Sequence, residues 1–234
     1  MTKDLIILPT YNERANIETL IHAIFAIVPH VSILVVDDNS PDGTGAIVEA
    51  LKLKFPRLHL LTREKKEGLG RAYAHAFREI AQHDALETVV TMDADFSHHP
   101  DYLPILLESC RKGYVAIGSR YVPGGKTVGW ELWRRILSAG ANIYIKIITR
   151  LPVDDATGGF NAIPATLLRK IDLTVFDASG YAFLIELKYL LWKQGGRFHE
   201  IPIVFRNRTG GESKISGHTI HEGILAPWKI IFSR

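Results

Sequence analysis

The sequence predicts an α/β protein built on a mainly parallel sheet, and two observations carry this prediction. Short apolar runs alternate with amphipathic stretches through the first half of the 234-residue chain. The apolar runs are continuous, which is typical of parallel strands covered by helices on both faces. A hydrophobic content of 47% at this length fits one domain with a sizeable core.

The elements of the first half are expected to follow one another as strand and helix. Strands are expected at Leu5–Leu8, Ser32–Val36, Leu58–Leu61, Thr88–Met92 and Val115–Gly118. Helices are expected at Ala15–Ile27, Thr44–Lys54, Gly70–His83 and Tyr102–Arg111. The second half is expected to contain a Gly-rich turn at Asp155–Phe160, helices near Leu167–Ile171, Phe183–Trp192 and His218–Phe232, a strand at Phe198–Phe205 and a mobile loop at 206–217.

Several protein classes are disfavoured by composition and by missing motifs. The net charge of +3 is too weak to indicate nucleic-acid binding, and the single cysteine excludes an internal disulfide. No phosphate-binding P-loop, dinucleotide-binding glycine motif or hydrolase nucleophile elbow occurs. No signal peptide is apparent, and no segment has the roughly 18 consecutive apolar residues of a membrane span. We therefore expect a cytoplasmic protein, soluble or peripheral to a membrane.

Polar residues follow each of the first five expected strands. These segments are Pro9–Glu13, Asp37–Thr44, Arg63–Lys66, Asp93–Asp95 and Ser119–Tyr121. Ligands of open α/β sheets bind beyond the carboxyl ends of the strands. The five segments together therefore predict one binding crevice, rich in carboxylate and guanidinium groups.

The pair Asp93 and Asp95 indicates a divalent metal. Strand alternation would point both carboxylates to one side, where they repel each other unless a cation lies between them. Such oxygen ligands suit Mg²⁺ or Mn²⁺, which completes its shell with water and substrate phosphates. The alternative is that one Asp ends the strand and the other begins a turn. His98 and His99 are expected to shape the turn or contact substrate, because histidine prefers softer metals.

Two basic segments of the second half have both a functional and a structural interpretation. The segment from Trp130 to Leu151 mixes aromatic, aliphatic and basic residues, which fits an interfacial helix near anionic headgroups. The alternative is a helix packed on the domain with a solvated basic edge. Helical spacing places Arg134 and Ser138 on one face. The segment 206–214 has cations that could fold over a diphosphate, although a solvated basic loop is the default interpretation.

The ordered motifs PTYNE, VVDDNSPDGT, REKKEGLGRAY, MDADFSHHP, GSRY, TGGF and GGESK resemble those of polyprenol (dolichyl) phosphate mannose synthases, within the inverting family 2 glycosyltransferases. The resemblance spans about Leu5 to Lys214. It implies a GT-A fold and transfer of mannose from GDP-mannose to a polyprenyl phosphate, assisted by Mg²⁺ or Mn²⁺. It also implies peripheral contact with the cytoplasmic face of a membrane, through interfacial helices or small membrane partner subunits.

The resemblance implies a single domain, 1–234, in which residues 1–122 bind nucleotide sugar and metal and 123–234 bind the acceptor. The donor-binding residues would be Pro9, Tyr11, Glu13, Val36, Asp38, Asp93, Ala94, Asp95, Arg120, Arg208 and Lys214. The metal would be held by Asp95 and, more weakly, by Ser97. The acceptor phosphate would be received by Arg134 and Ser138, and the catalytic residues would be Asp95, Arg120 and Arg208.

The chain departs from many of these relatives in its second half. Asn161 replaces an Arg after the Gly-Phe pair, and Leu184 replaces a Gln before the Ile-Glu pair. Glu186 occupies a position where many relatives have a carboxylate, and no role is assigned to it. Two alternatives therefore remain open: a family 2 transferase that uses UDP-glucose or another nucleotide sugar, and a nucleotide-sugar-binding regulatory protein without catalysis.

Overall fold

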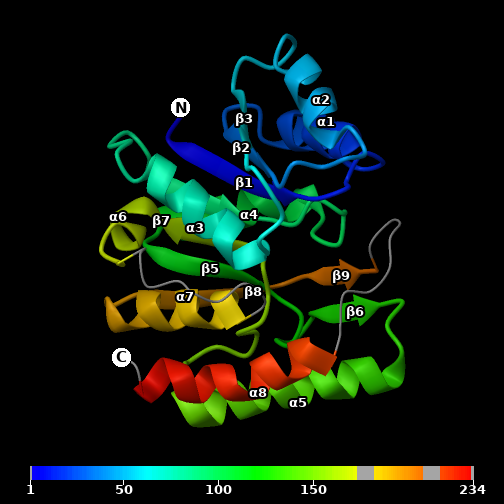
Figure 1. The fold of residues 1–234 in the computed structure, drawn as a ribbon. Coiled ribbons are helices and arrows are strands. Elements are labelled where there is room, and N and C mark those ends of the chain that lie inside the picture. The colour runs from blue at the N-terminus through cyan, green and yellow to red at the C-terminus, as the bar shows by residue number, and fades with distance from the viewer. Residues whose placement is uncertain (1, 173–181, 208–216, 233–234) are drawn as a thin grey trace.

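A seven-stranded sheet forms the centre of the protein in the computed structural model, which describes residues 2–172, 182–207 and 217–232 (Figure 1). Across the sheet the strands are β3 (Leu58–Thr62), β2 (Ser32–Asp37), β1 (Asp4–Thr10), β4 (Thr88–Thr91), β7 (Asn161–Pro164), β5 (Tyr114–Ser119) and β8 (Arg197–Pro202). All neighbouring pairs are parallel except those of β7, which is antiparallel to both β4 and β5. The expected mainly parallel sheet is confirmed.

Helices cover both faces of this sheet. The helices are α1 (Ile17–Ile27), α2 (Thr44–Leu51), α3 (Leu69–Ile80), the 3₁₀ turn η1 (Pro100–Tyr102), α4 (Leu103–Arg111), α6 (Ala165–Leu168) and α7 (Ala182–Lys193). Alternation along β1 sends Ile6 and Leu8 into the core under α1, α2 and α4. Leu5 and Ile7 point the other way, into the core under α3, α6 and α7.

Two further helices, α5 (Leu132–Thr149) and α8 (Gly217–Phe232), lie side by side beyond α7 (Figure 1). Ile145, Tyr189 and Ile230 join α5, α7 and α8 in a third apolar cluster. The hydroxyl of Tyr144 also links α5 to α8, because it donates to Ile224 O at 2.9 Å. Within the described residues, neither of these helices nor any other has the length and apolar character of a membrane span.

The expected strand Phe198–Phe205 is wrong as one element. The chain leaves the central sheet after β8, and Ile203 links two sheets through its backbone. Ile203 N donates to Ser119 O, and Ile203 O accepts from Lys126 N, both at 3.0 Å. The following residues form β9 (Val204–Arg206), which pairs in parallel with β6 (Lys126–Val128) in a separate two-stranded sheet.

The short strand β7 was not expected either. Its sequence, Asn-Ala-Ile-Pro, is too short and too polar at its ends to show a strand pattern. The loop predicted at 206–217 begins inside β9, and its residues 208–216 lie outside the described residues.

Candidate functional site

Asp37, at the end of β2, organises the loops in which the donor-binding residues are expected, called here the donor side. This buried carboxylate accepts the hydroxyl of Thr10 at 2.7 Å and that of Ser40 at 2.6 Å. It also accepts the backbone N–H of Ser40 at 2.9 Å. Asp37 is therefore occupied in joining the end of β1 to the loop that follows β2.

Asp38 forms a buried ion pair with Arg63, from the end of β3. The Arg63 Nη1 atom lies 2.7 Å from Asp38 Oδ1, and its Nη2 atom lies 2.6 Å from Glu67 Oε2. Burial raises the pKa of Asp38 above its ordinary value, although Arg63 opposes the shift. One arginine shared between two carboxylates leaves Asp38 with incomplete compensation. Further donor groups from a ligand would stabilise its charged form.

Tyr11 and Glu13 follow β1 on the same side. The ammonium of Lys66 lies 4.0 Å from the centre of the Tyr11 ring, a cation–π contact. Glu13 Oε2 accepts the side-chain amide of Asn16 at 3.0 Å. Both residues lie in the segment between β1 and α1, and their place in a nucleotide site stays a prediction.

Two of the expected donor residues have buried side chains, and their contact with a donor stays a prediction. Val36 is fully buried in β2, and Ala94 is buried in the core under α1, α2 and α4. Their side chains cannot face a ligand, so any contact must use the backbone. Pro9 pairs with Val36 across β1 and β2 and remains partly buried.

The two acids Asp93 and Asp95 lie in a loop, because β4 ends at Thr91. The side chain of Asp93 is 31% exposed, whereas Asp95 is buried. Asp95 Oδ1 accepts the backbone N–H of Ser97 at 3.0 Å and its hydroxyl at 2.6 Å. Strand alternation therefore cannot place the two carboxylates on one side. The alternative, in which the chain turns at these residues, describes the backbone. Ser97 orients Asp95 here, and its role as a metal ligand stays a prediction.

His98 supports this loop from inside. It is buried against the ring of Phe160, at a centroid distance of 5.0 Å. Its Nδ1 atom accepts the backbone N–H of Asp93 at 3.0 Å, which assigns the proton of the neutral ring to Nε2. Burial lowers the pKa of His98 despite the nearby carboxylates. His98 therefore shapes the turn, which was one of the two roles expected for it.

The residues present fit a hard divalent cation with a partial protein shell. Asp95 and its exposed neighbour Asp93 offer carboxylate oxygens, which suit Mg²⁺ or Mn²⁺. In the part of the chain that the structure describes, no three His, Cys, Asp or Glu side chains group together for a metal. A metal here would therefore need oxygens from a bound diphosphate or water.

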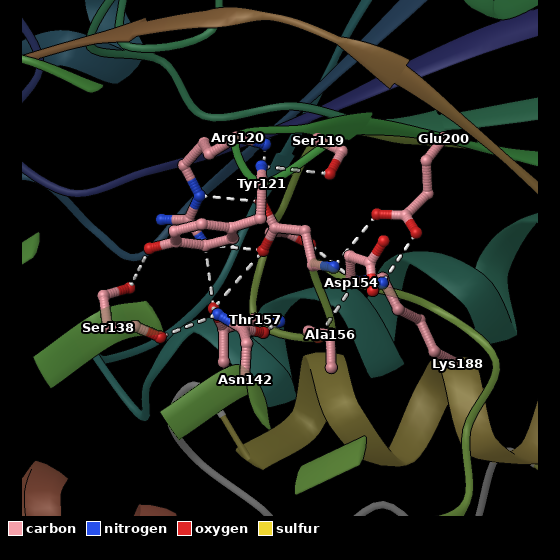
Figure 2. Close-up of polar contacts among 12 residues, drawn as sticks. Ser119, Arg120, Tyr121, Ser138, Asn142, Asp154, Ala156, Thr157, Lys188 and Glu200 are labelled. Atoms are coloured by element: carbon pink, nitrogen blue, oxygen red, sulfur yellow. Dashed lines mark hydrogen bonds and ion pairs between the residues drawn. The ribbon is translucent and has the colours of Figure 1, made fainter. Parts of the chain in front are cut away.

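The region in which the acceptor-binding residues are expected, called here the acceptor side, is centred on a second buried ion pair, Arg120 with Asp155 (Figure 2). Arg120 Nε and Nη2 donate to the two carboxylate oxygens at 2.8 and 2.6 Å, and Arg120 N donates at 3.0 Å. Burial alone would raise the pKa of Asp155, but Arg120 lowers it overall. The guanidinium carbon also lies 5.2 to 5.6 Å from the ring centres of Tyr121, Trp130 and Phe205.

The two expected acceptor residues lie beside this pair. The hydroxyl of Tyr121 donates to Ser138 Oγ at 2.6 Å (Figure 2). The guanidinium of Arg134 stacks on the Trp130 ring at 4.1 Å, so that Arg120 and Arg134 share one aromatic neighbour. The structure thus brings Arg120, Arg134 and Ser138 together.

Sequence reasoning missed two charged residues of this region. The ammonium of Lys188, on α7, is completely buried and donates to Gly158 O at 2.6 Å and Ala156 O at 3.2 Å. Glu200, on β8, accepts the backbone N–H groups of Asp154 and Asp155 at 2.6 and 3.0 Å. A lysine inside the apolar helix sequence FLIELKYLL was the available signal for the first.

The departures from the resemblance lie in the same region. Asn161 Nδ2 donates to Thr91 Oγ1 at 3.0 Å and to Gly158 O at 3.3 Å. Leu184 is buried in the core under α3 and α7. Arg208 and Lys214, expected to clamp the diphosphate, lie outside the described residues.

Comparisons with known proteins agree with this architecture. A polyprenol monophosphomannose synthase of Mycolicibacterium smegmatis is 42% identical over 97% of this chain and 87% of its own length. An undecaprenyl-phosphate mannosyltransferase of Micrococcus luteus is 40% identical over 94% of this chain and 90% of its own.

Among solved structures, glucosyl-3-phosphoglycerate synthase from Mycobacterium tuberculosis, in complex with Mn²⁺, UDP and phosphoglyceric acid, has a similar fold. It superposes with a TM-score of 0.72 at 19% identity, over 98% of this chain and 78% of that one. This likeness confirms the expected GT-A fold. The sequence profile named Glycosyl transferase family 2 matches residues 5–172, and the chain therefore belongs to that family.

Proposed function

We propose that this protein transfers mannose from GDP-mannose to a polyprenyl phosphate, with inversion at the anomeric carbon. The observation that carries the proposal is the meeting of two unlike sites at one edge of the sheet. Asp38 and the Asp93–Asp95 loop offer carboxylates on the donor side, and Arg120 and Arg134 gather on the acceptor side. Relatives that are 40% and 42% identical are named as mannosyltransferases or synthases of polyprenyl phosphates.

The donor side suits a nucleotide diphosphate sugar. Asp38, with its raised pKa and incomplete compensation, would accept hydrogen bonds from the nucleoside. Tyr11 and Glu13 would border the same moiety. Asp93 and Asp95 would hold Mg²⁺ or Mn²⁺ against the diphosphate, and the bound metal would neutralise charge on the leaving group.

The transfer needs no general base. An oxygen of the acceptor phosphate, already anionic near neutral pH, would attack the anomeric carbon of the mannose. The bond from that carbon to the β-phosphate oxygen would break, and its electron pair would leave with GDP. No proton has to move, so the side chains act by alignment and by stabilising charge. Arg120, Arg134 and Ser138 are the described residues that would align the acceptor phosphate.

A membrane surface is the proposed place of the reaction, because α5 and α8 expose apolar side chains together. Trp133 and Ile147 on α5 are 57% and 69% exposed, and Phe232 on α8 is 81% exposed. Arg135 and Arg150 are exposed on α5 and at its end, where they would meet anionic headgroups. Small membrane partner subunits and the cytoplasmic face stay predictions from the resemblance.

A labelled-donor assay tests the proposed function. The full chain is incubated with Mn²⁺, polyprenyl phosphate and either labelled GDP-mannose or labelled UDP-glucose, and the lipid phase is counted. We expect label in the lipid phase from GDP-mannose and its loss when the metal is chelated. Label from UDP-glucose alone would overturn the donor assignment. Binding of GDP-mannose without any lipid product would favour the non-catalytic alternative.

A further inference from the structure

The buried Lys188 has no role in the reaction described above, yet its position is costly. A fully buried ammonium loses its hydration, and burial lowers the pKa of Lys188 to about 8 even though Asp155 and Glu200 oppose the shift. An apolar side chain at this position of α7 would avoid that cost. The ammonium therefore has to be compensated by what it binds.

The partners of Lys188 are two backbone carbonyls of one short turn. Its Nζ atom donates to Gly158 O at 2.6 Å and to Ala156 O at 3.2 Å (Figure 2). Gly158 O also accepts the side-chain amide of Asn161, at the longer distance of 3.3 Å. Peptide units next to Gly158 and Gly159 reorient at little steric cost, because glycine lacks a Cβ atom. Among the described contacts to these two carbonyls, the hydrogen bond from Lys188 to Gly158 O is the shortest.

The first half of this turn holds the acceptor side. Asp155 binds Arg120 through both carboxylate oxygens. The hydroxyl of Thr157 accepts Arg120 Nη2 at 2.8 Å and Asn142 Nδ2, from α5, at 3.1 Å. A shift of the turn would therefore move Arg120 relative to α5, where Arg134 and Ser138 lie.

The second half of the same turn contacts the Asp93–Asp95 loop. A Cβ atom built on Gly159 would lie 3.5 Å from Asp93 Oδ1 and 3.4 Å from His98 Cε1. Gly159 O accepts the hydroxyl of Thr91, from the end of β4, at 2.7 Å. The turn therefore spans the distance from the donor side to the acceptor side, and its position sets how the two are spaced.

We propose that Lys188 is a positioning residue for glycosyl transfer: its buried ammonium pins the Asp155–Gly159 turn and thereby fixes Arg120 relative to the Asp93–Asp95 loop. The consequence for the reaction rests on the proposed function. The claim that Lys188 holds the turn in place does not rest on the proposed function, and it can be measured independently of turnover.

The test compares Lys188→Met with Lys193→Met, which removes the same charge from the exposed end of α7. Lys188→Met is expected to lower kcat by about 10- to 100-fold, because misplacement of the reacting groups by about 1 Å can cost as much as about 100-fold. GDP affinity with Mn²⁺ should stay within about twofold, because the Asp93–Asp95 loop is held by its own hydrogen bonds to His98 and Ser97. The midpoint of thermal unfolding should stay within about 4 °C. Lys193→Met should behave as wild type.

Hydrogen exchange of the segment 154–160 tests the pinning without substrate. The amides of Asp155 and Thr157 donate to Glu200 and Asn142, and we expect about tenfold faster exchange there in Lys188→Met. Exchange in β1 and β2 should be unchanged. Wild-type exchange in the turn, or wild-type kcat, would overturn the proposal. A fall in kcat that comes with equal losses of GDP affinity and thermal stability would also overturn it.

Two further outcomes are separated by design. If Lys188→Met does not fold, Lys188→Gln replaces it: the shorter amide keeps a donor but cannot reach both carbonyls, and kcat should fall at least about threefold. Wild-type kcat in Lys188→Gln would overturn the proposal. If the wild-type protein transfers no sugar from any donor, the proposed function fails, and exchange in the turn still decides whether Lys188 pins it.

Discussion

The two buried arginine–aspartate pairs of this protein consist of the same residue types, but the pKa values of their aspartates shift in opposite directions. Arg63 makes one side-chain contact with Asp38, at 2.7 Å, and its second guanidinium nitrogen pairs with Glu67 instead. Arg120 gives Asp155 two side-chain hydrogen bonds and one from its backbone. The pKa of Asp38 is accordingly raised, mainly by burial, whereas that of Asp155 is lowered in spite of burial.

The difference indicates different roles for the two sides. Asp155 already has its hydrogen-bonding capacity filled by protein, so it acts as scaffold for Arg120 and the turn behind it. Asp38 is buried with less compensation, so a ligand that supplies donors would be bound favourably there. On the proposed function, Asp38 would thus bind a ligand on the donor side, whereas Arg120 and Asp155 on the acceptor side are held by protein contacts.

The largest expected effect is on stability, in Asp155→Asn. Removal of one partner leaves Arg120 buried without its counter-charge, which costs about 3–5 kcal/mol in similar cases. Urea unfolding measures the change. The matched control is Asp154→Asn, because Asp154 is half exposed and pairs with Lys146 at the surface, where the loss should be below about 1 kcal/mol. Equal losses in the two variants would contradict the scaffold role of Asp155.

Asp95→Ala is expected to reduce turnover by about 10²–10³-fold while the protein stays folded, because charge stabilisation of the leaving diphosphate is lost. Transfer of labelled mannose to lipid and circular dichroism measure the two parts. Asp101→Ala is the control, because Asp101 is an exposed carboxylate of the same loop region that pairs with His99. An active Asp95→Ala variant would contradict the metal assignment.

Arg134→Ala is expected to raise the KM for polyprenyl phosphate by about tenfold, the value of one charge-assisted hydrogen bond. The KM for GDP-mannose should change much less, because Arg134 lies on the acceptor side. Steady-state kinetics with each substrate varied in turn give both values. The control Lys112→Ala removes an exposed cation at the end of α4 that pairs with Glu108, and it should change neither KM substantially. A larger effect of Arg134→Ala on the donor would reverse the assignment of the two sides.

The pH dependence of stability should separate the two aspartates by sign. The pKa of Asp155 is lowered by folding, so its contribution is present above the unfolded value and is lost as pH falls through the folded value. The pKa of Asp38 is raised, so its contribution is present below the unfolded value and is lost as pH rises through the folded value.

Urea unfolding between about pH 3 and pH 7 checks this, with each aspartate replaced by Asn. The stability difference between wild type and Asp155→Asn should shrink toward acid pH. The difference for Asp38→Asn should change in the opposite direction. Parallel changes in the two variants would show that the pairs do not differ as described.

Much of the first half could be predicted from sequence because its signals are local. Continuous apolar runs located β1, β2 and β3 to within one or two residues, and the binding crevice expected after them stays a prediction. The strand β7 could not be predicted, because its place is set by pairing with Thr88–Thr91, about 70 residues earlier in the chain.

In the candidate site, too, local sequence signals could be predicted and long-range contacts could not. Spacing singled out Asp93 and Asp95 as candidates, but their orientation depends on Ser97 and His98, which sequence spacing does not encode. Lys188 was missed because a lysine in a helix normally extends into solvent. Only the fold brings the carbonyls of Ala156 and Gly158, about 30 residues away, to its ammonium.

Calorimetric titration of GDP in the presence of Mn²⁺ tests most directly whether the two sides divide the substrates as described. Asp38→Asn should weaken the binding of GDP by about tenfold, because a carboxylate that would accept hydrogen bonds from the nucleoside is lost. Arg134→Ala should leave GDP affinity within about twofold of wild type. Weaker GDP binding in Arg134→Ala together with unchanged binding in Asp38→Asn would contradict the account.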